Sequence, residues 1–174
     1  MSNSTATLRV YVADLAAYSA GSLKGAWVNL AGLDEDEMRE AFETAANGNE
    51  WAIHDYELAG IRISEYPNLE KLAETVEGIK EHGNAYIAYR HHVDEADASL
   101  NHFEDCYRGT CDSPAEYFEN LEEDCGGLED IPERFRNYIN WESMAEDARL
   151  SGELSFVQIV DGTADPLTYV FSNR

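Results

Sequence analysis

Carboxylates dominate the side chains of this sequence that could do chemistry. Thirty-five Asp and Glu residues stand against twelve Lys and Arg, which gives a formal charge of −23 over 174 residues. Paired carboxylates perform acid–base catalysis, but with so many candidates no single pair stands out. The run Asp34–Glu37 resembles a calcium loop in composition only, because Arg39 occupies the sixth position, where such loops need Gly. The carboxylates therefore indicate no particular catalytic or calcium site.

Histidine and cysteine supply the other candidate ligands and nucleophiles. The x₃ and x₄ spacings between His102, Cys106 and Cys111 match no CxxC pair, which argues against a zinc site. The adjacent His91-His92 fall on different faces of an expected helix, and His54 reads as a structural residue bonded to its neighbouring aspartate. Neither a phosphate-binding glycine loop nor a GxSxG elbow occurs. The sequence thus predicts no enzyme, no cofactor and no metal.

Bulk composition indicates a folded cytoplasmic protein. Apolar residues make up 44% and aromatic residues 11% of the chain, enough for a packed core. No apolar run approaches the ~18 residues of a membrane span. The stretch Met1–Thr7 is polar, unlike a signal peptide, and the three cysteines are an odd number, as expected where thiols stay reduced. We expect neither membrane nor nucleic-acid binding, because the negative field repels both.

The net charge is larger than a fold needs. A small soluble domain does well with a charge magnitude of ~2–8, and self-repulsion destabilises a compact state. Duplex DNA carries one charge per ~1.7 Å of axis, so 23 charges equal those on roughly 39 Å, or about 12 base pairs. This favours a protein that imitates nucleic acid. The alternatives are an ordinary or salt-adapted acidic domain, a Ca²⁺- or Mg²⁺-binding or hydrolytic protein, and a scaffold for a basic partner.

Secondary-structure signals give an α+β fold. Strands are predicted at 8–18, 26–30 and 50–58, and a helix begins after Asp34 with a capping-box partner at Glu37. Further helices are predicted at 68–81, 84–92, 93–109, 114–125 and 140–150, with a short one from Ile131-Pro132. The segments 153–160 and 167–172 read as a hairpin around Asp161-Gly162.

The length suits one large domain or two to three small ones, and the charge is uneven over three parts of the chain. The N-terminal α+β domain (1–61) carries a net charge of −7, the central helical domain (62–102) −4, and the C-terminal domain of helices and a hairpin (103–174) −12. The densest stretch, Asp94–Asp130, has thirteen acids and one base.

Helical spacing groups many of the carboxylates. In the 68–81 helix, four Glu residues at i, i+4, i+7 and i+11 form a stripe of ~16 Å opposite the apolar face, with steps comparable to phosphate spacing. Like charges at i,i+4 destabilise a helix slightly, so stability alone does not explain them. The predicted acidic surface comprises Glu70, Glu74, Glu77, Glu81, Asp94, Asp97, Glu104, Asp105, Asp112, Glu116, Glu119, Glu122, Glu123, Asp124, Glu129 and Asp130.

Three segments carry a family resemblance. They are YVADLAAYSAGSLKGAWVNL at 11–30, EWAIHDYELAGIRISEY at 50–66 and IPERFRNYINWESMAEDARLSGEL at 131–154. Together they resemble the ArdA antirestriction proteins of plasmids and conjugative transposons, over roughly residues 8–172. The resemblance implies an elongated, three-domain, dimeric mimic of bent B-form DNA that inhibits type I restriction–modification enzymes. Tyr18 and Trp27 of the first segment are expected to be packed, with no partner contact.

The resemblance also places the family's antirestriction motif, near the dimer interface, on 137–150. The chain departs from the family pattern at three positions. It has Asn140 where the family has Asp, Trp141 where the family has Tyr, and Glu146 where the family has a basic residue. The extra charge of Glu146 bears on the details of the interface rather than on the family. The motif and interface residues implied are Tyr138, Ile139, Asn140, Trp141, Glu142, Met144, Ala145 and Asp147.

Overall fold

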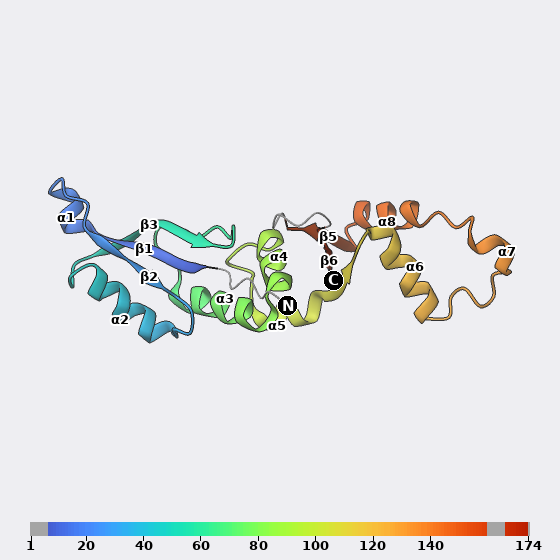
Figure 1. Ribbon diagram of the computed structural model, residues 1–174, viewed down its shortest axis with the longest axis horizontal. Helices are drawn as coiled ribbons and strands as arrows, with labels where there is room; N and C mark the ends of the chain where they lie inside the picture. Colours follow the sequence, from blue (N-terminus) through green and yellow to red (C-terminus); the bar gives the residue numbers. More distant parts are fainter. Residues whose placement is uncertain (1–6, 160–165, 174) are drawn as a thin grey trace. The chain divides into compact units, whose positions relative to one another are not determined.

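Two three-stranded antiparallel sheets, each with its own helices, form the fold in the computed structural model, which describes residues 7–159 and 166–173 (Figure 1). The chain divides between Asn101 and His102 into two compact units, here called unit 1 and unit 2. The sheets and helices confirm the α+β class. The elongated three-domain arrangement, including the separation of 1–61 from 62–102, stays a prediction.

The sheet of unit 1 has β1 (Leu8–Asp14) at its centre, between β2 (Gly25–Asn29) and β3 (Trp51–Leu58). Burial alternates from Leu8 to Val12, where Arg9 and Tyr11 are half-buried between buried residues, and Ala13 and Asp14 at the end of β1 are buried as well. Helix α2 (Glu35–Ala45) contacts β1 and β2. The alternation and the covering helix place the core of unit 1 on one face of this sheet.

Strand β1 ends four residues earlier than the sequence suggested. The Asp14 carboxylate accepts a hydrogen bond from the Ala17 amide at 3.0 Å and so caps helix α1 (Leu15–Ser19). It also accepts bonds from the side-chain amides of Asn47 and Asn49. These hydrogen bonds lower the pKa of Asp14, and the bond from the Ala17 amide has the largest effect. The strand predicted over 8–18 was therefore wrong beyond Asp14.

Helices α2, α3 (Leu69–His82) and α4 (Asn84–His92) confirm their sequence signals. Asp34 and Glu37 form a complete capping box, and the Asn68 side chain accepts the Lys71 amide at the start of α3. The Tyr86 ring packs against Gly78, where an added Cβ would lie 2.5 Å from the ring. Glycine at that position thus lets α3 and α4 approach closely.

Tyr18 and Trp27 are not buried as expected. Tyr18 is 57% exposed and Trp27 41% exposed. Each still has one ring contact, Trp27 with Tyr11 and Tyr18 with His54. The prediction that both residues are packed inside the fold was wrong, because their segments lie on the uncovered face and the α1 end of the sheet.

Unit 2 is built around a second sheet in the order β4-β6-β5. Helix α6 packs against α8, and the rings of Phe103, Tyr107 and Phe171 meet in its core. Helix α5 begins in unit 1 and crosses the boundary. The elements are α5 (Leu100–Cys106), β4 (Tyr107–Cys111), α6 (Pro114–Asp124), α7 (Glu133–Arg136), α8 (Trp141–Leu150), β5 (Leu154–Gln158) and β6 (Thr168–Ser172).

The helix predicted over 93–109 was wrong at both ends. Asp94 and Asp97 lie in turns before α5, and the chain after Cys106 is strand β4, paired with β6. Gly109 has a φ of +119°, a backbone conformation that does not occur in a right-handed helix. The hairpin prediction is confirmed by the antiparallel pairing of β5 with β6. Its expected turn, Asp161-Gly162, lies outside the described residues.

Candidate functional site

Exposed carboxylates crowd unit 2. Of the ten predicted acidic residues there, Glu116 and Glu122 are half-buried and eight are exposed. The eight come from α5, α6 and the turns around α6, so they occupy a continuous part of the sequence. We call them the unit-2 acidic surface: Glu104, Asp105, Asp112, Glu119, Glu123, Asp124, Glu129 and Asp130.

Helix α6 shows which of its carboxylates the fold uses. The Ser113 hydroxyl accepts the Glu116 amide at 3.2 Å, with Pro114 at the first helical position, as predicted. The Glu116 carboxylate accepts the Asp112 amide at 2.7 Å, so it supports the start of the helix. Glu123 and Asp124 lie in the last turn, which holds no base. Negative charge at a helix C-terminus is unfavourable, so stability does not account for these two.

Ion pairs are distributed unevenly between the units. In unit 1, five Glu or Asp residues pair with Arg or Lys. Within the described part of unit 2, the one such pair joins Glu146 to Arg149 at 2.6 Å, and this bond lowers the pKa of Glu146. The unit-2 acidic surface therefore has no ion-pair partner among the described residues. The unit-1 pairs are Arg9–Glu57, Arg39–Glu35, Arg39–Asp36, Lys71–Glu74 and Lys80–Glu77.

The stripe expected on α3 is not uniform. Glu70 and Glu81 are exposed, whereas Glu74 and Glu77 are half-buried and paired with lysines. Glu74 also accepts the Leu100 amide. Acid and base at i,i+3 are a recognisable signal, and it could have identified the α3 pairs and Glu146–Arg149 from the sequence. Two of the four α3 carboxylates are thus paired with lysines, and that of Glu81 lies 3.9 Å from a ring nitrogen of His82.

The motif implied at 137–150 surrounds the start of α8. The Asn140 side chain caps α8 by accepting the Ser143 amide at 3.0 Å, while Tyr138 just before it is 83% exposed. Ala145 is buried, and the other predicted motif positions divide between half-buried (Ile139, Trp141, Met144) and exposed (Glu142, Asp147). The motif thus presents an exposed aromatic ring beside exposed carboxylates.

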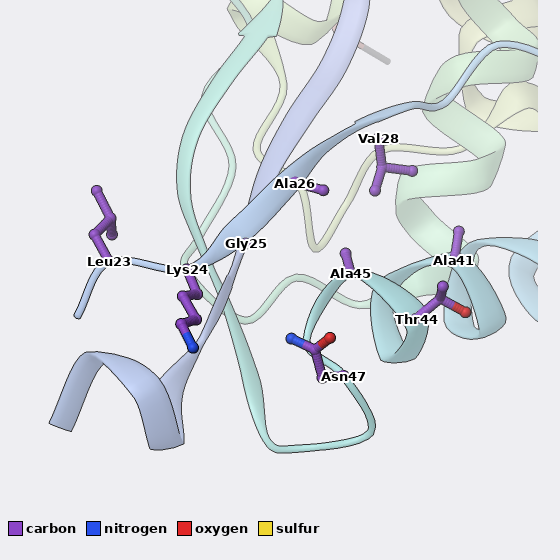
Figure 2. Close-up of a pocket in the computed structure, with 9 residues that line it drawn as sticks. All are labelled: Leu23, Lys24, Gly25, Ala26, Val28, Ala41, Thr44, Ala45 and Asn47. Carbon is purple, nitrogen blue, oxygen red and sulfur yellow. The ribbon is translucent and has the colours of Figure 1, made fainter. Parts of the chain in front are cut away.

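Each unit has an open groove. The groove in Figure 2 lies between β2 and α2 and has a volume of about 580 Å³. Its lining is mostly small side chains, and the Lys24 ammonium is its one charged group. A second, of about 560 Å³, lies between α6, α8 and the second sheet, where Glu142, Glu146 and Arg149 line it.

The histidine and cysteine candidates have ordinary surroundings. Cys106 and Cys111 are buried, and burial raises the pKa of both thiols, that of Cys111 to about 11. Thiols with raised pKa are poor ligands and nucleophiles at neutral pH. The Asp55 carboxylate accepts the Tyr56 amide, while the His54 ring contacts Tyr18. Across 7–159 and 166–173, no three His, Cys, Asp or Glu gather as a metal site.

Removing charge from the end of α6 is expected to stabilise the protein. The double change Glu123→Gln with Asp124→Asn should raise the free energy of unfolding by about 0.3–1 kcal/mol per charge, because both carboxylates oppose the helix dipole. Urea denaturation monitored by circular dichroism measures this. Glu116→Gln at the other end of α6 is the control and should not stabilise. A loss of stability in the double variant would contradict this interpretation.

Comparison with known proteins gives one clear result. A family model described as "Antirestriction protein (ArdA)" matches residues 10–160, which include most of unit 1 and α5 to α8. Among curated proteins, none matches the chain at a significant level. None of the described helices combines the length and apolar character needed to cross a membrane. The matched range covers most of the 174 residues, and the chain therefore belongs to the ArdA family of antirestriction proteins.

Proposed function

We propose that this antirestriction protein imitates duplex DNA and occupies the DNA-binding groove of type I restriction–modification enzymes. The observation that carries the proposal is the unit-2 acidic surface, whose eight carboxylates are exposed and have no ion-pair partners among the described residues. Two of them stand at the C-terminus of α6, where they oppose the helix dipole. Because these two carboxylates do not stabilise the helix, we expect them to bind a partner.

The mechanism is competition for one groove. Enzymes that bind duplex DNA draw much of their affinity from Lys and Arg contacts to phosphates. A folded surface of carboxylates offers those cations similar charges, but it has no bases to read and no phosphodiester bond to cleave. The inhibitor should therefore block enzymes of one architecture whatever their target sequence. Opposite charges also steer encounter, so association should be fast.

We further propose that the chain acts in the cytoplasm as a homodimer. Two copies at −23 each carry −46, equal to the phosphates of roughly 23 base pairs. Tyr138, 83% exposed in the motif before α8, supports an interface there, since a large exposed ring is typical of contact surfaces. The implied interface residues are those of the motif, 138–142, 144, 145 and 147.

Displacement of DNA tests the function. The protein is added to a type I modification enzyme bound to fluorescently labelled duplex, and release of the duplex is followed by anisotropy. We expect stoichiometric release at low salt, and sedimentation analysis should give the mass of a dimer. If the duplex stays bound while the added protein is folded, the proposal of DNA mimicry is wrong.

A further inference from the structure

Three side chains hold the last residues of unit 1. The Lys71 ammonium donates to the Ala98 carbonyl at 2.8 Å, the Ser99 amide donates to the Tyr89 hydroxyl at 3.1 Å, and the Leu100 amide donates to the Glu74 carboxylate at 2.8 Å. Lys71 and Glu74 come from α3, and Tyr89 from α4. Three consecutive residues of the chain are thus each bound through their backbone. We call Lys71, Glu74 and Tyr89 the 98–100 clamp.

The clamp lies where unit 1 ends. Leu100 is the first residue of α5, which continues past the boundary after Asn101. The first amides of a helix lack partners within it, and Glu74 provides one for Leu100. A bond from an amide to a carboxylate is stronger than one between neutral groups. The start of α5 is therefore tied to α3 by a charge-assisted bond.

The clamp residues are also shielded from solvent. The side chains of Lys71 and Glu74 are 31% and 27% exposed, with their charged groups 3.6 Å apart. Tyr89 is fully buried, and Ala98 is 4% exposed. An ammonium beside a carboxylate leaves no net charge for a cationic partner to contact. Glu74 thus differs from Glu70 and Glu81, which are exposed on the same helix.

We propose that Lys71, Glu74 and Tyr89 are positioning residues, which hold residues 98–100 and so fix the start of α5, the helix that carries Glu104 and Asp105. Glu74 then contributes to inhibition through its hydrogen bond and not as a substitute for a phosphate. The consequence for inhibition rests on the proposed function. The hydrogen bond between Glu74 and Leu100 does not depend on the proposed function, so the bond and its effect on inhibition can be tested separately.

Hydrogen exchange of single amides tests the clamp without any enzyme. Glu74→Ala should speed exchange of the Leu100 amide by about tenfold or more, because its acceptor is lost. Glu74→Gln keeps an oxygen acceptor and should change that rate much less. Tyr89→Phe should speed exchange of the Ser99 amide in the same way. The Val76 amide, inside α3, reports whether the fold persists. Unchanged Leu100 exchange in Glu74→Ala would overturn the clamp.

Inhibition assays with the same variants separate positioning from charge. Glu81→Gln is the matched control, because it removes one exposed carboxylate from the same helix. The clamp predicts that Glu74→Ala weakens DNA displacement severalfold more than Glu74→Gln, which should resemble Glu81→Gln. Equal losses in Glu74→Ala and Glu74→Gln would show that only charge matters and would overturn the positioning role. If the wild-type protein displaces no DNA, the proposed function fails, while the exchange rates still decide the clamp.

Discussion

Replacing all eight carboxylates of the unit-2 acidic surface by amides is expected to abolish inhibition of a type I restriction–modification enzyme. Exposed charge pairs contribute about 0.2–1 kcal/mol each, so eight contribute about 1.6–8 kcal/mol, and the middle of that range corresponds to more than about a thousandfold in affinity. One amide alone should cost about fivefold or less. Titration of labelled duplex off the enzyme gives the apparent affinity of each variant.

A control distinguishes the effect of where the carboxylates lie from the effect of the total charge. Glu119, Glu123 and Asp124 on α6 are exposed, as are Glu40, Glu43 and Glu50 in unit 1, outside the predicted acidic surface. Neutralising either set changes the formal charge from −23 to −20. The α6 set should weaken displacement by roughly threefold to a hundredfold, and the unit-1 set by much less. Equal losses would mean that total charge, and not its placement, determines binding.

Local signals in the sequence predicted most helices because the relevant contacts are local. Asp34 and Glu37, three residues apart, bond to each other's backbone. At the start of α6 the Ser113 hydroxyl accepts the Glu116 amide, and Pro114 occupies the first helical position. The Asp14 cap of α1 was equally local. It was missed because the β-branched residues before it suggested that the strand continued. Element type could thus be predicted wherever caps and apolar periodicity agreed.

Long-range contacts decided the rest. Tyr107–Cys111 continued a helical apolar pattern from Phe103, but the segment pairs with β6, some sixty residues later, and strand pairing overrides local preference. For the candidate site, periodicity grouped the carboxylates of α6, of which Glu119, Glu123 and Asp124 are exposed, while Glu116 and Glu122 are half-buried. It could not show that Glu74 reaches Leu100, because that bond joins residues 26 positions apart. Exposure follows from local spacing, whereas partners depend on the tertiary fold.

Salt should affect the inhibitor less than it affects DNA. Between about 50 and 200 mM salt, a protein with 6–10 phosphate contacts loses ~10³–10⁵ in affinity for duplex, because binding releases ions condensed on the densely charged backbone. Carboxylates on α6 are sparser than the charges of a duplex, since its eleven residues carry five, or one per about 3.3 Å of helix axis against one per ~1.7 Å in DNA. Fewer ions condense on such a surface, so fewer are released. The affinity of the inhibitor should therefore fall by a smaller factor over the same range.

Labelled duplex can be displaced from the enzyme either by the inhibitor or by unlabelled duplex. The expected result is that the concentration of inhibitor needed for half displacement, divided by the concentration of unlabelled duplex needed, falls as salt rises. Unlabelled duplex is the matched competitor, because its salt dependence equals that of the labelled duplex and cancels in the ratio. The variant with Glu119, Glu123 and Asp124 neutralised should show a still shallower dependence, since it makes fewer charged contacts. If this ratio instead rose with salt, so that unlabelled duplex became the better competitor, the prediction would be contradicted. Inhibitor binding would then release more ions than DNA binding does, which sparse carboxylates cannot supply.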